Sequence, residues 1–98
     1  MINITFNAKW GRIWLSGHSG YAEPGSDIVC AGISALYETL AIHPMTYAGK
    51  DCKMNNEHFV CAKPDTYCVM RPMFEAFATG MEAIAKRYPE NVKFDRIE

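Results

Sequence analysis

The sequence lacks the charge and the long apolar segment that would assign it to two common functional classes. Lysine and arginine total 10 against 11 aspartate and glutamate residues, so the formal net charge is −1. A chain this close to neutral lacks the long-range positive field of nucleic-acid-binding proteins, and no direct nucleic-acid partner is expected. No apolar run approaches the ~20 residues of a membrane-spanning helix, so no membrane partner is expected.

Cysteine and histidine are present, but their spacing does not match a metal site. The 4 cysteines include no C-x-x-C pair, and the 3 histidines include no H-x-x-x-H pair. The usual zinc and dithiol motifs are therefore excluded, and we expect neither a metal nor a cofactor. The first eight residues show no basic segment before an apolar block, so no secretory signal is expected. These features favour a cytoplasmic protein with reduced thiols.

The length and composition predict one globular domain over residues 1–98. The chain has 98 residues, of which 49% are hydrophobic and 21% are charged, and these are ordinary globular values. A domain of this size buries only about two-thirds of its unfolded surface, so association into a dimer would add to its stability.

Alternating apolar and polar residues predict an antiparallel hairpin at the N-terminus. Residues 2–7 and 13–18 alternate with period two around a turn at 9–12, and His18 ends the second strand. Residues 19–26 contain glycine, proline and serine, which indicates a loop. Asp27 is a good N-cap for a helix that runs to Ile42 and stops near His43 because of Pro44.

The second half of the chain predicts a shorter hairpin, a second helix and a last strand. After an irregular segment at 45–50, strands at 51–55 and 58–62 would place Cys52 opposite Cys61. The two residues would pack as small apolar side chains, with a disulfide as the alternative. The second helix would begin near Arg71, after a turn or short strand at 66–70.

That second helix would end at Tyr88, and a strand would follow at 92–94. Gly80 within it indicates close packing against another element. The resulting order, β-β-α-β-β-α-β, predicts an α+β fold in which two helices pack on one face of a small, mostly antiparallel sheet.

Cys30 is the residue best placed to be a nucleophile. With Asp27 as the N-cap, Cys30 lies in the first helical turn, near unpaired N–H groups and the positive end of the helix dipole. Both favour the thiolate, which is the nucleophilic form, while the charge of Asp27 opposes it. The alternative is a small buried residue in an apolar first turn.

His18 precedes Cys30 by one strand end and one loop, so the two side chains can meet in a compact fold. Such a pair supplies a general base and a nucleophile, although a histidine at a sheet edge is also an ordinary polar residue. Ser34 lies one turn after Cys30 on the same helix face. Its hydroxyl would bond the thiolate or a substrate carbonyl, or else its own i−4 carbonyl.

The segment Gly17–Leu36 resembles the signature of the Prp family, the bacterial ribosomal-processing cysteine proteases. The shared features are Gly17-His18, a loop with a late glycine, Asp-Ile-Val-Cys-Ala at 27–31, and Ser34 one turn on. Residues 74–81 and 88–90 also resemble the family's second helix and exit turn. Gly32 departs from the family, which usually has alanine there, and the segment 61–74 is unlike a typical member.

The resemblance implies a homodimeric cysteine endopeptidase with a protein substrate. This substrate would be a ribosomal large-subunit protein, or a similar phage or host protein, whose short N-terminal extension is cut after aromatic residues. By motif position, Cys30 would be the nucleophile and His18 the general base, with Gly17, Asp27 and Ser34 in supporting roles. A flexible flap over the substrate would comprise Ser19, Gly20, Tyr21, Ala22, Glu23, Pro24, Gly25 and Ser26.

In the expected reaction, His18 takes the thiol proton and the N–H of Cys30 or Ala31 holds the oxyanion. Three other functional classes stay open. They are a thiol hydrolase of a non-peptide ester, a redox sensor with a resolving thiol, and a non-catalytic ribosome- or RNA-associated module, which the neutral charge disfavours. The methionine- and phenylalanine-rich second helix is the candidate dimer surface.

Overall fold

The computed structural model describes residues 1–23, 27–48, 52–54, 58–61 and 64–97, with side chains described for 1–23, 27–40 and 67–97. The order β-β-α-β-β-α-β predicted from the sequence is confirmed. The elements are β1 (Ile2–Asn7), β2 (Arg12–Ser16), α1 (Ile28–Ala48), β3 (Cys52–Met54), β4 (His58–Cys61), α2 (Pro64–Arg87) and β5 (Val92–Ile97).

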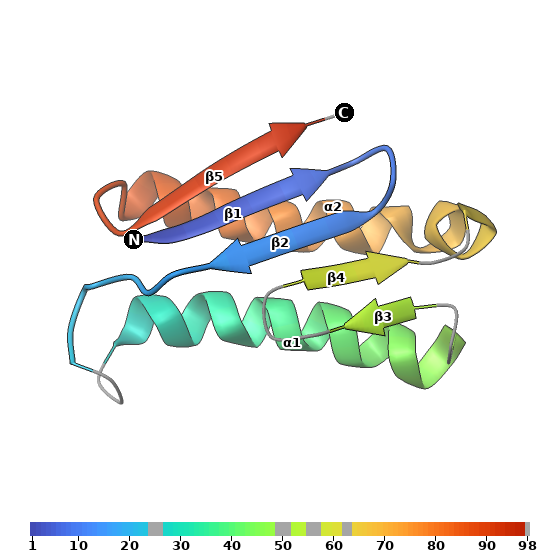
Figure 1. Cartoon of the computed structure of the whole chain (residues 1–98), viewed down its shortest axis with the longest axis horizontal. Coiled ribbons are helices and arrows are strands. Elements are labelled where there is room, and N and C mark those ends of the chain that lie inside the picture. The colour runs from blue at the N-terminus through green and yellow to red at the C-terminus, as the bar shows by residue number, and fades with distance from the viewer. Residues whose placement is uncertain (24–26, 49–51, 55–57, 62–63, 98) are drawn as a thin grey trace.

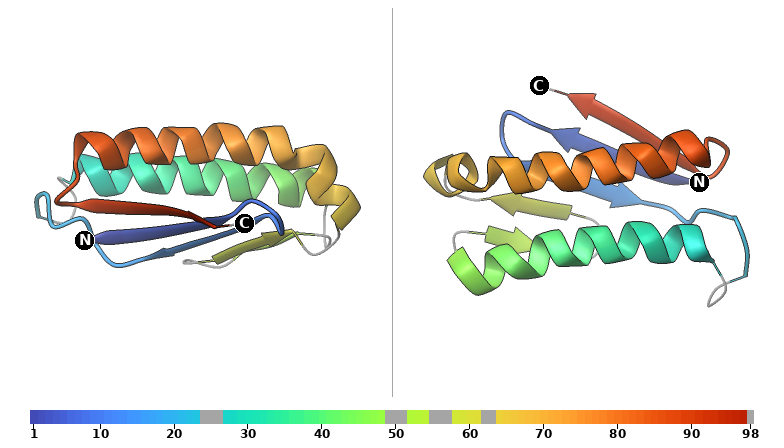
Figure 2. Two further views of the ribbon diagram at one scale, coloured as in Figure 1. Left: turned by 90° about the horizontal axis from the view of Figure 1, so that it is seen from above. Right: turned by 180° about the vertical axis from the view of Figure 1, so that it is seen from behind.

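The strands form one sheet in the order β3-β4-β2-β1-β5 (Figure 1). All neighbouring pairs are antiparallel except β1 and β5, which are parallel. Both helices lie on the same face of this sheet (Figure 2). The predicted class, a mostly antiparallel α+β fold with two helices on one face, is therefore confirmed.

The core lies between the sheet and the helix layer. Alternate residues of β1 point into it, as the period-two pattern predicts, and each helix contributes one apolar stripe. Its largest fully buried side chains are Ile4, Phe6, Ile13, Val29, Ile33, Leu40, Phe74 and Met81.

The β1–β2 turn packs on the first turns of α2. Gly11 adopts a positive φ of 65°, and a Cβ there would lie 2.2 Å from Cδ1 of Tyr67. The Tyr67 hydroxyl donates a hydrogen bond to the Ala8 carbonyl oxygen. Only glycine allows this approach, so the turn is fixed against the helix.

Helix α1 is longer than predicted, because it continues through Pro44 to Ala48. The expected end near His43 is wrong, and so is the irregular structure expected for residues 45–48; residues 49 and 50 lie outside the described part. An interior proline removes one backbone hydrogen bond. The contacts of α1 with α2 and β3 outweigh that loss, since helices in proteins are stabilised mainly by packing.

Helix α2 begins at Pro64, seven residues before the predicted start at Arg71. Residues 66–70 are helical, so neither the turn nor the short strand considered for them is present. Pro64 occupies the first helical position, where a missing N–H costs nothing. Pro72 is instead interior, and the first turns of α2 make an angle with the rest of the helix (Figure 2), as expected at proline.

The two later strand predictions differ in accuracy. Strands β3 and β4 pair with Cys52 opposite Cys61, as predicted. The turn at 56–57, the side chains of both cysteines and the alternative of a disulfide between them lie outside the described part. Strand β5 continues to Ile97, three residues beyond the predicted end.

The helices approach each other at two glycines. A Cβ on Gly80 would lie 3.3 Å from Cδ1 of Leu36, which confirms the close packing predicted there. A Cβ on Gly32 would lie 3.6 Å from Cδ1 of Ile84, an ordinary contact distance. Within the described residues, neither helix is long and apolar enough to cross a membrane.

Candidate active site

Asp27 caps helix α1 and sets the position of Cys30. The Cys30 N–H donates to Asp27 Oδ1 at 2.9 Å, and the Ala31 N–H donates to the Asp27 carbonyl oxygen at 3.1 Å. The predicted N-cap is therefore confirmed. The hydrogen bond from Ser19, together with backbone N–H donors led by that of Cys30, lowers the pKa of the Asp27 carboxyl below its ordinary value of 3.8.

The same two hydrogen bonds overturn one expectation about the reaction. The N–H groups of Cys30 and Ala31 were expected to hold an oxyanion, but both are used by Asp27. To donate to a substrate, Cys30 would have to break the cap and Ala31 the first backbone hydrogen bond of the helix. An oxyanion in this site needs other donors.

Gly17 turns the chain from the end of β2 toward the helix layer. Its φ is 85°, and a Cβ there would lie 2.2 Å from the Met1 carbonyl oxygen. A side chain at this position would meet backbone, which cannot rotate away. His18 follows Gly17 and is exposed to solvent.

Ser19 connects the loop to both Asp27 and Cys30. Its side chain is 2% exposed, and its hydroxyl donates to Asp27 Oδ2 while accepting the Tyr21 N–H at 3.1 Å. The Ser19 N–H donates to the Cys30 Sγ at 3.4 Å. Through this backbone N–H, Ser19 fixes the position of the sulfur.

The turn after α2 holds the same loop from the other side. Asn91 Nδ2 donates to the Ser19 carbonyl oxygen at 2.9 Å. The rings of Tyr21 and Tyr88 meet edge to face, with centroids 5.4 Å apart. The sequence reasoning missed these contacts, because Asn91 is distant in the chain; the Tyr88–Glu90 match to the family's exit turn was the only signal near it.

A pocket of about 450 Å³ opens at the start of α1. His18 and Cys30 both line this pocket, as predicted from the strand end and loop that separate them in the sequence. The pocket is lined by His18, Gly20, Ala22, Asp27, Cys30, Ala31 and Ser34. Of the other residues proposed for the site, Gly17, Ser19, Tyr21 and Glu23 are not among the lining residues but adjoin them in the sequence, and residues 24–26 are outside the described part.

Two details of the pocket bear on its chemistry. In the described part of the chain, no hydrogen bond joins His18 to Cys30, which is common in a catalytic pair without its substrate. Ser34 also makes no bond to the carbonyl four residues earlier, in contrast to Thr39 and Thr79, whose hydroxyls donate at 2.7 and 2.8 Å. The Ser34 hydroxyl is thus available to a ligand in the pocket.

Cys30 is half-buried, which excludes a fully buried structural cysteine. Among the described residues, no three His, Cys, Asp or Glu side chains gather as a metal site would require. The pocket therefore offers the Cys30 thiol, the His18 imidazole and the Ser34 hydroxyl. Together these groups suit nucleophilic attack on a carbonyl carbon.

Comparison with known proteins agrees with this chemistry. Residues 1–93 match the family described as cysteine protease Prp. The chain belongs to the Prp family of cysteine proteases. No curated protein sequence matches it significantly.

Solved structures show that this Prp family member has the fold of its relatives. It is similar to the ribosomal processing protease Prp from S. aureus with a covalently linked product peptide, at a TM-score of 0.77 and 19% identity, covering 99% of this chain and 100% of that one. The same S. aureus protease with a substrate peptide gives a TM-score of 0.68 at 20% identity, covering 98% and 97%. A protein of Streptococcus mutans gives 0.72 at 25%, covering 98% and 91%.

Proposed function

We propose that this Prp family member is a cytoplasmic, homodimeric endopeptidase that removes a short N-terminal extension from a ribosomal large-subunit protein, or from a similar phage or host protein. The observation that carries the proposal is that His18 and Cys30 line the same pocket. Family membership and the fold shared with a ribosomal processing protease support the substrate class.

In the proposed reaction, the His18 imidazole takes the proton of the Cys30 thiol and the sulfur attacks the peptide carbonyl carbon. The C–N bond then breaks as His18 returns the proton to the leaving amine, which leaves an acyl-enzyme. Water attacks the acyl carbon while His18 takes its proton; the C–S bond then breaks, the carboxylic acid leaves, and His18 returns the proton to the Cys30 sulfur. No cofactor or metal takes part.

The Ser34 hydroxyl is the proposed oxyanion donor in place of the engaged N–H groups of Cys30 and Ala31. The Ser19 N–H donates to the Cys30 sulfur at 3.4 Å and is therefore engaged as well. The Ser34 hydroxyl lines the pocket one helical turn after Cys30. Donors positioned before the reaction stabilise the developing charge without reorganisation.

The loop after His18 is the proposed substrate flap. Ser19 fixes its base, while Gly20 and Ala22 line the pocket with little side-chain bulk. Small lining residues leave room for a large side chain on the substrate, in keeping with a preference for aromatic residues before the cut. Closure over a matching peptide would restrict cleavage to the correct protein.

The test compares two cysteine variants on peptides spanning an N-terminal extension. Cys30→Ala should lower cleavage to the uncatalysed rate, while Cys68→Ala, which removes the exposed cysteine on α2, should retain the wild-type rate. Mass spectrometry of the products gives both the rate and the cut site. Circular dichroism checks that each variant is folded.

Peptides with aromatic residues replaced by alanine before the cut test the substrate preference in the same assay. Cleavage by folded Cys30→Ala would refute the assignment of the nucleophile. Turnover of a small thioester without cleavage of any peptide would instead favour the ester hydrolase.

A further inference from the structure

Strand β5 forms one edge of the sheet, and its outer side meets no other strand of the described chain. Its inner side pairs with β1 over all six residues, from Ile2 opposite Val92 to Asn7 opposite Ile97. In Figure 1 this strand lies along the border of the molecule, away from β3 at the opposite edge. An edge strand of this length is a template for pairing with another chain.

The hydrogen bonds to β1 show which backbone groups face outward. The N–H of Ile2 donates to the Asn91 carbonyl oxygen, and that of Ala8 donates to the Ile97 carbonyl oxygen. In a parallel ladder alternate residues turn their peptide groups to the neighbouring strand, so odd-numbered residues of β5 face β1. Phe94 therefore presents both its N–H and its C=O to the outer edge.

The side chains of β5 form a self-complementary set around Phe94. Lys93 and Asp95 flank Phe94 on the face of the sheet without helices, with Nζ and Oδ2 3.8 Å apart. Their side chains are 62% and 55% exposed. If a second β5 pairs antiparallel with Phe94 opposite Phe94, each Lys93 lies opposite an Asp95 of the other copy. Opposite charges directly across two strands favour that register.

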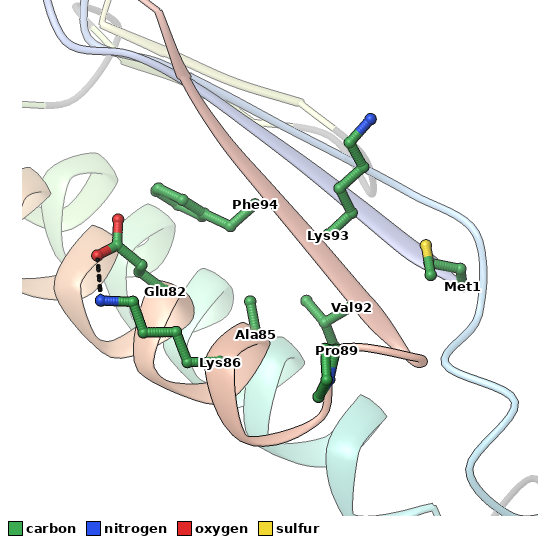
Figure 3. A pocket seen from close by; sticks show the side chains of 8 residues that line it. All are labelled: Met1, Glu82, Ala85, Lys86, Pro89, Val92, Lys93 and Phe94. Carbon is green, nitrogen blue, oxygen red and sulfur yellow. Dashed lines mark ion pairs between the residues drawn. The ribbon is translucent and has the colours of Figure 1, made fainter.

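The helix side of β5 offers a shallow apolar groove at the same place. This groove has a volume of about 590 Å³ and runs between the end of α2 and β5. Figure 3 shows Phe94, Val92 and Ala85 along it, with Lys93 on the other side of the strand and the Glu82–Lys86 ion pair at its rim. Phe94 of a second copy would pack against Phe94 here, which would cover an aromatic side chain that is only half-buried.

We infer that two copies of this chain pair through β5, antiparallel and centred on Phe94, so that the sheets join into one continuous sheet. The N–H of each Phe94 donates a hydrogen bond to the C=O of the other Phe94. Two Lys93–Asp95 pairs form across the two-fold axis that relates the copies. This surface differs from the apolar face of α2 that the sequence suggested. It rests on the proposed homodimer for its occupant, and not on the proposed catalysis.

A charge exchange tests the register. Lys93→Asp places two aspartates opposite each other at both cross-strand pairs, and Asp95→Lys places two lysines there. Each substitution should raise the dimer Kd by about tenfold or more. The combined variant Lys93→Asp/Asp95→Lys restores both cross-strand pairs and should return the Kd to near the wild-type value. Sedimentation equilibrium over a wide range of concentration gives each Kd, and thermal melting checks that each variant is folded.

Crosslinking gives a second, independent measurement. In the inferred register a Lys93→Cys chain mixed with an Asp95→Cys chain should form a disulfide-linked pair on mild oxidation, mapped by mass spectrometry. Either chain alone should form far less, because residues 93 and 93, or 95 and 95, are offset along the strands.

The outcomes separate this surface from the proposed activity. A monomer at all concentrations, or a dimer whose Kd ignores both charge variants, would overturn the β5 surface. Peptide cleavage, measured in parallel with the Cys30→Ala variant as the blank, reports on the catalytic proposal whatever the oligomeric state.

Discussion

At the scale of single residues, Asp27 links the loop after β2 to helix α1. Its carboxylate accepts hydrogen bonds from the Ser19 hydroxyl and the Cys30 N–H, and so joins the loop to the helix that carries the thiol. Ser19 in turn places its own N–H against the sulfur. The carboxylate therefore positions the site, and it contacts Ser19 where a catalytic triad would have it contact the histidine.

Substituting Asp27 separates its oxygen atoms from its charge. Asp27→Ala removes every side-chain acceptor, so we expect the Tm to fall by several degrees and cleavage to fall at least tenfold. Asp27→Asn retains an acceptor oxygen for the cap and should lose much less of both. Melting curves and initial rates of peptide cleavage measure the two effects. Equal losses in both variants would show that the charge, rather than the hydrogen bonds, is what matters.

Gly17 and Gly20 form a matched pair for testing how His18 is held. Both have a positive φ, of 85° and 69°, but only Gly17 faces backbone atoms at close range. Gly20→Ala should therefore lower the free energy of unfolding by about 1–2 kcal/mol, because alanine is strained in the left-handed region. Gly17→Ala adds a collision with the Met1 carbonyl oxygen.

We expect Gly17→Ala to be less stable than Gly20→Ala, and to lose activity because His18 is displaced. Urea unfolding and cleavage rates measured on both variants test this. A Gly17→Ala variant as stable and active as Gly20→Ala would contradict the argument.

Much of the site at this scale was readable from the sequence. The N-cap role of Asp27 follows from residue type and from the apolar helical spacing after it. The link from Ser19 to Asn91 did not follow, because their spacing of 72 residues carries no local pattern. The engagement of the Cys30 and Ala31 N–H groups was missed because a cap residue can accept through its side chain and its carbonyl at once.

At the scale of the elements, packing decides where the helices end. Pro44 predicts an end of α1, but contacts with α2 and β3 extend it to Ala48. Pro72 suits a helix start, yet Tyr67, Met70 and Phe74 are buried at helical spacing before and after it. A proline indicates only the local backbone preference. The apolar stripe on both sides of Pro72 predicts the extent of α2 better.

The two helical glycines predict opposite responses to alanine. Gly32→Ala gains helix propensity and meets only Ile84 Cδ1 at 3.6 Å, so we expect it to stabilise the protein by about 1 kcal/mol. Gly80→Ala gains the same propensity but presses on Leu36 at 3.3 Å, so its net effect should be smaller. Urea unfolding of both variants measures the difference. A destabilised Gly32→Ala would show that the helices cannot accept even one methyl group there.

At the scale of the whole molecule, the direction of β5 was beyond sequence reasoning. Alternating hydrophobicity shows which face of a strand is buried but not whether it runs parallel to its neighbour.

An ion pair between Arg96 and Glu75 connects β5 to α2, in addition to the contacts in the core. Arg96 Nη1 and Nη2 lie 2.9 and 2.8 Å from Glu75 Oε2 and Oε1.

This pair makes the stability of the molecule depend on acidity. The hydrogen bonds from Arg96 lower the pKa of Glu75 below its ordinary value of 4.5. The hydrogen bonds from Ser19 and Cys30 likewise lower the pKa of Asp27 below its ordinary value of 3.8. A carboxyl with a lowered pKa in the folded state stabilises the protein above its ordinary value, and this stabilisation is lost as the pH falls through the folded-state pKa. Unfolding should therefore become easier from about pH 4.5 downward.

Glu75→Gln isolates the contribution of the ion pair. At pH 7 we expect it to cost about 0.5 kcal/mol, a small value because both side chains are partly exposed, at 38% and 35%. Below the folded-state pKa of Glu75 this side chain is uncharged in the wild type too, so the difference in free energy of unfolding between wild type and Glu75→Gln should vanish. Urea unfolding at pH 7 and at successively lower pH values down to 3 measures how the difference declines, with Glu82→Gln, from the more exposed pair with Lys86, as the control. A difference that persists unchanged at pH 3 would mean that the substitution acts through packing rather than charge.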